Sequence, residues 1–181
     1  VEDAINNPAL RGFVDGLIRE ETIPTIYAPK GLSLTEYWAQ IIARFENPNI
    51  VHLLEQISHD GSQKIPARIF PVIEHHAKNG NIARRACFVT AAWIVFNHQR
   101  RKTDMPPTDG YLAQIEAALP TPNLSIRDYS HAFLDLDSVV PVSISGSADL
   151  RAEILKAATL ISDCGVEAAA KTYCASAGSV A

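Results

Sequence analysis

The residues best suited to hold a ligand form one polar turn, His59–Pro66, with the sequence His-Asp-Gly-Ser-Gln-Lys-Ile-Pro. This turn stands directly before an apolar run with helical spacing, where free backbone N–H groups and the helix dipole favour a negative or oxygen-rich ligand. Lys64 would place a mobile ammonium group above that helix end. A ligand with hydroxyl or carboxylate oxygens would suit this arrangement, and the alternative is a well-capped loop with an exposed lysine.

Other patterns that carry chemistry are absent from the sequence or have a structural explanation. The nine glycines never fall as G-x-G-x-x-G or before a Lys-Ser/Thr pair, so we do not expect this chain alone to bind a nucleotide. His75 and His76 are adjacent and would point about 100° apart on a helix. Cys87, Cys164 and Cys174 form no C-x-x-C pair. We therefore expect no metal site, and reduced, mostly buried thiols.

Helical spacing dominates the elements that must position the polar turn. Ser33–Glu36 has the form of a capping box, and the helix that it starts should stop near Asn47–Pro48. A helix over Ile65–Lys78 should kink at Pro71 and end at Asn79–Asn81. Further helices are predicted over Ile50–Ser58, Ile82–Lys102, Gly110–Leu119, Ala148–Ser162 and Val166–Cys174.

The Ile82–Lys102 segment would be about 31 Å long as a helix. Its middle is apolar on every face, so we expect it to be the central helix, buried on all sides. Only Leu134–Ile144 has some strand character, and Pro141 makes a regular strand there unfavourable. A chain of 181 residues can bury one full-sized core. The sequence thus predicts a mainly α, multi-helical single domain.

The charge distribution leaves two classes of function open. Residues 1–60 carry four bases and nine acids, residues 61–102 eight bases and one acid, and residues 103–181 four bases and ten acids. The basic middle segment could bind an anionic partner. A local anion site or simple pairing with the acidic flanks explains the charge better than nucleic-acid binding, which is not expected. The most apolar run, Ala86–Phe96, is too short to cross a bilayer, and the N-terminus has no secretory signal. We expect a cytoplasmic protein.

Two motifs in fixed order carry a resemblance to a known family. Arg44-Phe45-Glu46-Asn47-Pro48 and the stretch Asp60–Arg68 (Asp-Gly-Ser-Gln-Lys-Ile-Pro-Ala-Arg) resemble the R-F-x-N-P and D-G-S-x-K-x-P-x-R signatures of the mannitol dehydrogenase family. This family of long-chain polyol dehydrogenases includes fructuronate reductase, also called D-mannonate oxidoreductase. The opening residues and the pattern Leu150–Gly165 are also similar, so the resemblance covers most of the chain.

The resemblance implies a two-domain enzyme of which residues 1–181 are the helical, substrate-binding C-terminal domain. A Rossmann domain that binds NAD or NADP would precede this domain, and the activity would be the metal-independent interconversion of a secondary alcohol and a ketone on a polyol or sugar acid. The family's general base is the lysine of a K-x-x-x-x-N-x-x-H motif, which is expected upstream of Val1 and does not occur here. The chain alone is therefore expected to be inactive, and its oligomeric state is open.

The residue roles that the resemblance implies centre on the polar turn. Lys64 matches a lysine that lines the substrate pocket as a second cation, and Gln56, Asp60 and Ser62 are expected to bind substrate with it. Mannitol dehydrogenases tend to have an arginine where this chain has Gln56, whereas the fructuronate reductase branch has a glutamine followed by D-G-S-Q-K. This pattern favours D-mannonate and fructuronate as the substrate pair, with mannitol and fructose next. The loss of the arginine cation itself does not favour a carboxylate at that spot.

Two further hypotheses stand beside this one. The chain could be a non-enzymatic helical module that binds an anionic partner through residues 61–102. It could also be a stand-alone enzyme whose nucleophile and base are paired only in space, which one sequence does not reveal.

Overall fold

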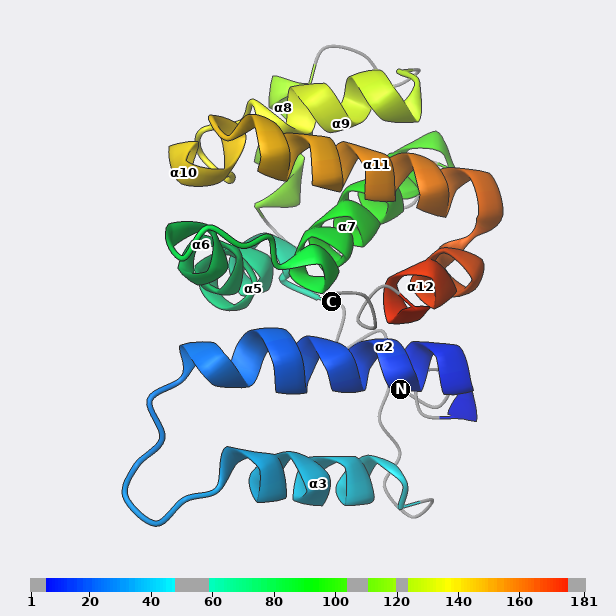
Figure 1. Ribbon diagram of the computed structural model, residues 1–181. Coiled ribbons are helices and arrows are strands. Elements are labelled where there is room, and N and C mark those ends of the chain that lie inside the picture. Colours follow the sequence, from blue (N-terminus) through cyan, green and yellow to red (C-terminus); the bar gives the residue numbers. More distant parts are fainter. Residues whose placement is uncertain (1–5, 48–58, 104–110, 120–123, 176–181) are drawn as a thin grey trace.

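The chain folds into a stack of helices with the longest of them, α7, at its centre (Figure 1). The computed structural model describes residues 6–47, 59–103, 111–119 and 124–175. Over these ranges all regular secondary structure is helical and no strand forms. The predicted mainly α fold class is confirmed.

The first helix was not among the predicted elements. α2 (Pro8–Gly16) begins after Asn7, whose side-chain oxygen accepts hydrogen bonds from the backbone N–H groups of Ala9 and Leu10 at 3.0 and 3.2 Å. Proline at the first helical position fits this start, because its missing N–H would be unbonded there anyway. The helix continues into a π-helical turn, η1 (Leu17–Thr22), and a short 3₁₀ turn, η2 (Ile23–Thr25). Such π turns shift the register of the side chains that follow.

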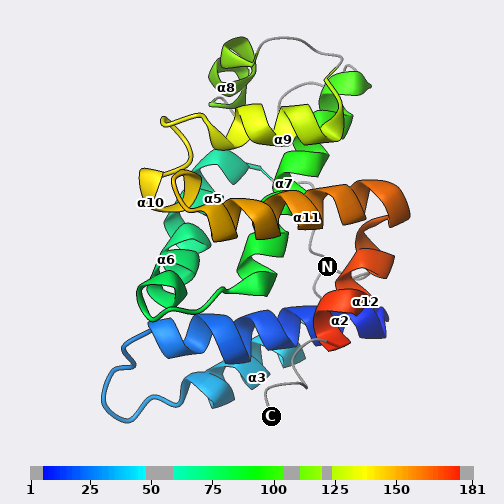
Figure 2. The same ribbon diagram turned by 45° about the horizontal axis from the view of Figure 1, so that its top comes forward.

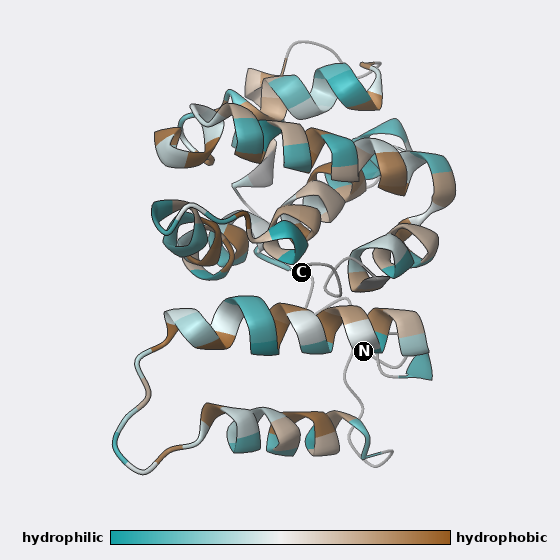
Figure 3. Cartoon of the chain, viewed as in Figure 1, coloured by the Kyte–Doolittle hydropathy of each residue, from teal (hydrophilic) through white to brown (hydrophobic). Residues whose placement is uncertain are grey.

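The capping box of the next helix is confirmed in its first half. α3 (Leu34–Phe45) starts after Ser33, whose hydroxyl oxygen accepts the Glu36 backbone N–H at 3.3 Å. Trp38 is buried and its indole N–H donates to Asp15 Oδ1 at 2.8 Å, which ties α3 to α2. The colouring in Figure 3 shows apolar and polar residues alternating around α3. The other apolar residues of its inner face, Ile41, Ile42 and Phe45, are only half-buried.

The predicted kinked helix over Ile65–Lys78 is two helices. α5 (Gly61–Arg68) and α6 (Phe70–Lys78) meet at Ile69. Pro71 lies in the first turn of α6, where its missing N–H costs nothing, so the chain restarts a helix there and does not bend one. The helix predicted over Ile50–Ser58 lies outside the described residues.

The central helix has the predicted place, but the prediction that it is buried on all sides is wrong. In α7 (Arg84–Lys102) the Phe96 side chain is 40% exposed. Asn97 and His98 are buried instead, since the Asn97 amide donates to Trp93 O at 2.9 Å and His98 Nε2 lies 2.8 Å from Leu124 O. Successive residues point about 100° apart, and the neighbouring helices cover only part of the circumference.

The helices around α7 come from the last third of the chain. α11 (Ala148–Cys164) crosses α7, and α9 (Ile126–Leu134) lies beside both (Figure 2). Gly165, at φ 82°, then reverses the chain into α12 (Val166–Ala175), which returns to α2. The predicted ends of these last two helices, on either side of Gly165, are therefore confirmed.

The N- and C-terminal helices share an aromatic core with α7. The rings of Phe13 and Tyr173 each lie 4.8 Å from the ring of Phe88, centroid to centroid. Tilted aromatic pairs at this distance add to the apolar burial. These three side chains, from α2, α7 and α12, thus join segments that are up to 160 residues apart in the sequence.

Two short helices complete the described part of the chain. α8 (Leu112–Ala118) confirms the predicted helix over Gly110–Leu119. The partial strand character of Leu134–Ile144 has no counterpart, because the chain forms helical turns there and Pro141 directly precedes α10 (Val142–Ser145). None of the described helices has the length and hydropathy needed to span a membrane.

Candidate functional site

The polar turn at the start of α5 has a strained but well-bonded backbone. Asp60 has φ 58° and ψ 35°, the left-handed conformation, which among the described residues no other non-glycine residue adopts. Aspartate and asparagine tolerate this region better than most residues. The Asp60 carbonyl accepts the backbone N–H groups of Gln63 and Lys64 at 3.0 and 2.9 Å. The turn therefore fixes the direction in which α5 leaves it.

Lys64 extends from the first turn of α5 back over its start. Its ammonium nitrogen donates to the His59 carbonyl oxygen at 2.6 Å, and the side chain is half-buried. Ser62, two residues earlier in the same helical turn, is buried. The structure thus places Asp60, Ser62 and Lys64 within one helical turn. Gln56 lies outside the described residues, and the binding of substrate by all four stays a prediction.

Gly61 is the point where this turn meets the central helix. A β-carbon built at Gly61 would lie 2.7 Å from the indole nitrogen of Trp93, closer than such atoms approach in proteins. A larger residue here would displace the turn or the indole ring, so space and not φ favours glycine. Sequence reasoning assigned Trp93 to an all-round apolar core and missed this contact, since nothing in the helical spacing marks it.

Three cations of the basic segment pair with acids of the flanking segments, as the charge pattern suggested. Arg84 Nε lies 3.0 Å from Glu153 Oε1, and the buried Arg85 guanidinium lies 2.7 Å from Glu20 Oε2. Arg100, also buried, pairs with Glu116. Such pairing leaves fewer cations for an external polyanion, and so weighs against the binding-module hypothesis.

The adjacent histidines His75 and His76 do not form a metal site. His76 Nε2 lies 2.8 Å from the Glu21 carbonyl oxygen, and His75 stands exposed beside it. Over the described ranges no three His, Cys, Asp or Glu side chains gather closely enough to hold a metal ion.

A cavity of about 280 Å³ lies between α2 and α3, away from the polar turn. Its charged residues pair with one another: Arg11 with Glu46, and Arg19 Nε with Asp15 Oδ1 at 2.8 Å. Burial alone would raise the pKa of Asp15, but hydrogen bonds from Arg19 and Trp38 outweigh it and lower the pKa. This cavity contains none of the predicted site residues. Its full lining is Arg11, Asp15, Arg19, Ala39, Ile42, Ala43 and Glu46.

Comparison with known families gives one match over most of the chain. Residues 1–159 match the family described as the mannitol dehydrogenase C-terminal domain. The D-mannonate oxidoreductase of Escherichia coli (strain K12) is 36% identical over 94 residues, which are 52% of this chain and 19% of that protein. A mannitol 2-dehydrogenase of Emericella nidulans is 29% identical over 170 residues, which are 92% of this chain and 33% of that protein.

Among solved structures, the Pseudomonas fluorescens mannitol 2-dehydrogenase, in its ternary complex with NAD and D-mannitol, has the same fold. The TM-score is 0.80 at 22% identity, and the match covers 93% of this chain and 34% of the other. The matches therefore cover between 19% and 34% of the length of these three relatives.

Proposed function

The chain belongs to the mannitol dehydrogenase family, and we propose that it is the substrate-binding, C-terminal domain of an oxidoreductase that interconverts a secondary alcohol and a ketone on a polyol or sugar acid. The observation that carries this proposal is the turn at the start of α5. There Asp60 fixes the backbone in the left-handed conformation, and the Lys64 ammonium group lies over the helix start. The names of the relatives, D-mannonate oxidoreductase and mannitol 2-dehydrogenase, indicate the substrate class.

The chemical role of Lys64 follows from its charge and its place. An ammonium group has three donors and no acceptor, so it can donate to sugar hydroxyls or to a carboxylate. One of its acceptors, the His59 carbonyl, is a neutral oxygen that a substrate oxygen could replace. Charge-assisted hydrogen bonds of this kind are roughly twice as strong as neutral ones. Lys64 would thus bind and orient the sugar, while the general base would be the lysine of the family's K-x-x-x-x-N-x-x-H motif, outside the 181 residues.

The cofactor would be held outside this chain. Its described residues are helical, and its sequence has no dinucleotide fingerprint, so these residues do not fit NAD or NADP on their own. When bound to a preceding Rossmann domain, the nicotinamide would accept or return the hydride. We propose that the Rossmann domain completes the substrate pocket at the N-terminal end of α5.

We propose D-mannonate and fructuronate as the preferred substrate pair, and mannitol and fructose as the next. The D-G-S-Q-K stretch with Gln56 and the 36% identity with the D-mannonate oxidoreductase support this order. Mannitol 2-dehydrogenases that are 38% identical over 94 residues support mannitol and fructose as the second pair.

The test is an assay of the full-length protein that contains this domain. Oxidation of NADH and of NADPH would be followed with fructuronate, fructose and tagaturonate side by side. The highest kcat/KM with fructuronate is expected, and preference for fructose would make the enzyme a mannitol dehydrogenase with an altered pocket. No activity on any ketose, together with tight, salt-sensitive binding to a polyanion such as heparin, would favour the binding module instead.

A further inference from the structure

We propose that Trp93 is the positioning residue for Lys64: its indole ring on α7 sets where the first turn of α5 lies, and so where the lysine cation points. This inference rests on the proposed function. Its basis is the contact at Gly61, where a single added β-carbon would lie 2.7 Å from the indole nitrogen and 3.2 Å from Cδ1. The start of α5 rests directly on this ring.

The ring has little freedom to move away. Its centroid lies 5.0 Å from that of Phe133, at an interplanar angle of 86°, and Phe133 is fully buried in the core. The Trp93 backbone is held as well, because the Asn97 amide donates to its carbonyl oxygen at 2.9 Å. Closely packed interiors transmit displacement of this kind and do not absorb it.

The connection from the ring to Lys64 is short and stiff. Gly61 follows Asp60, whose left-handed backbone admits few alternatives, and the Asp60 carbonyl accepts the Lys64 N–H at 2.9 Å. The Lys64 ammonium in turn bonds to His59 on the other side of Asp60. A shift at Gly61 therefore changes the base of the lysine side chain and its carbonyl acceptor together.

The position of the ring also gives Trp93 a role distinct from that of a core residue. Trp93 is only half-buried, whereas Ile94 and Ala91 on the same helix are completely buried. The indole ring thus lies against the turn as well as against the core. The chain has one other tryptophan, Trp38, which lies between α2 and α3 and offers a matched control.

The experiment uses the full-length enzyme and compares Gly61→Ala, Trp93→Leu, their double variant, and Trp38→Leu. For both site variants, kcat/KM for the ketose is expected to fall on the order of tenfold to a hundredfold, mainly through KM, as small misplacements of binding groups do. The KM for NADH should not change. Trp38→Leu should lower the melting temperature without changing either KM.

The double variant is the sharpest measurement. Leucine has no atom where the indole nitrogen lies, so it makes room for the new β-carbon, and the loss in the double variant should be smaller than the product of the two single losses. If Trp93→Leu does not fold, Trp93→Phe keeps a ring against Phe133 and should show a smaller effect of the same kind.

The outcomes separate this inference from the proposed function. If the wild-type enzyme reduces no ketose, the proposed function fails, and the inference with it. If the wild type is active and Lys64→Met loses activity while Gly61→Ala and Trp93→Leu keep wild-type kcat/KM, only the inference is wrong. Strictly multiplicative losses in the double variant would also overturn it.

Discussion

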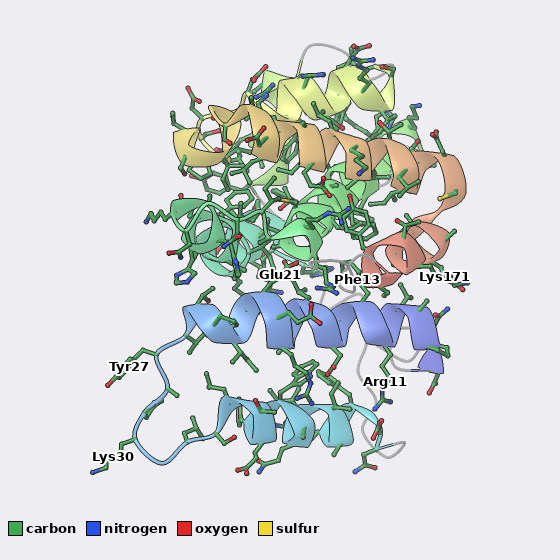
Figure 4. All side chains as sticks on the ribbon, in the orientation of Figure 1. Arg11, Phe13, Glu21, Tyr27, Lys30 and Lys171 are labelled. Carbon is green, nitrogen blue, oxygen red and sulfur yellow. The ribbon has the colours of Figure 1, made fainter. Side chains whose placement is uncertain are left out.

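The carboxylate of Glu21 caps the central helix at Arg85, 64 residues further along the chain. One oxygen accepts the Arg85 backbone N–H at 2.9 Å and the other accepts the Ala86 N–H at 2.8 Å. Figure 4 shows Glu21 and Phe13 directed from the N-terminal helix toward the rest of the molecule, and Arg11 directed to the opposite side. Carboxylates at helix N-termini satisfy unbonded donors and oppose the helix dipole. The N-terminal segment is thereby part of the framework that places α7.

Removal of this cap should destabilise the fold. Glu21 is only 7% exposed, so Glu21→Ala would leave two buried N–H groups without acceptors, at a cost of about 2–4 kcal/mol in the free energy of unfolding. Glu21→Gln keeps one acceptor and should cost less. Urea unfolding followed by circular dichroism measures both. Glu20→Ala is the control, since Glu20 is exposed and its pair with Arg85 should contribute at most about 1 kcal/mol. An equal loss in both alanine variants would contradict the capping role.

The buried His98 should make the protein less stable in mild acid. Burial, the largest cause, lowers the pKa of His98 from 6.5, even though the hydrogen bond to Leu124 O opposes this. The unfolded chain then takes up the proton more readily than the folded protein, so stability is full above pH 6.5 and falls as the pH decreases below it. Unfolding midpoints between pH 8 and pH 5 measure this slope. His98→Gln should have a shallower slope than the wild type, whereas the exposed His75→Gln should match the wild type.

The backbone at Asp60 predicts an uneven response to substitution. Alanine in the left-handed region costs about 1 kcal/mol or more relative to glycine, so Asp60→Ala should unfold at lower urea concentration than Asp60→Gly. If the two variants unfold together, the left-handed geometry is not maintained in solution.

The three cysteines should differ in their reactivity. The expectation that the thiols are mostly buried is wrong, because only Cys87 is buried, Cys164 is exposed and Cys174 is intermediate; all three are free thiols. Burial raises the pKa of the Cys87 thiol to about 12, so almost none of it is thiolate near neutral pH. Alkylation of the native protein with iodoacetamide, read by peptide mass spectrometry, should label Cys164 first and Cys87 only after unfolding. Early labelling of Cys87 would contradict the described core.

Capping residues, helix-ending glycines and apolar runs predicted the helices whose ends and positions depend on nearby residues. Ser33 before α3, Gly165 between α11 and α12, and the apolar run of α7 all give their elements in the predicted places. The start of α2 was open to the same reasoning, because Asn7-Pro8 is a cap followed by a first-turn proline.

The remaining features depend on contacts between distant segments. The Glu21 cap joins residues 64 positions apart, and the contact of Gly61 with Trp93 joins residues 32 positions apart. No helical period in the sequence indicates either contact. The partial exposure of Phe96 likewise depends on which sides of α7 its neighbours cover. For the candidate site, the motif supplied Asp60, Ser62 and Lys64. The helix predicted from Ile65 begins four residues earlier, at Gly61, so Ser62 and Lys64 lie inside its first turn.

The most direct test of the central claim is Lys64→Ala in the full-length enzyme. Loss of a charged hydrogen bond to substrate, about 1.5–3 kcal/mol, predicts a fall in kcat/KM for the ketose of about tenfold to a hundredfold, with the KM for NADH unchanged. Lys78→Ala, at the exposed end of α6, is the matched control and should behave as the wild type. A Lys64→Ala enzyme with wild-type kcat/KM would contradict the assignment of this turn to the substrate pocket.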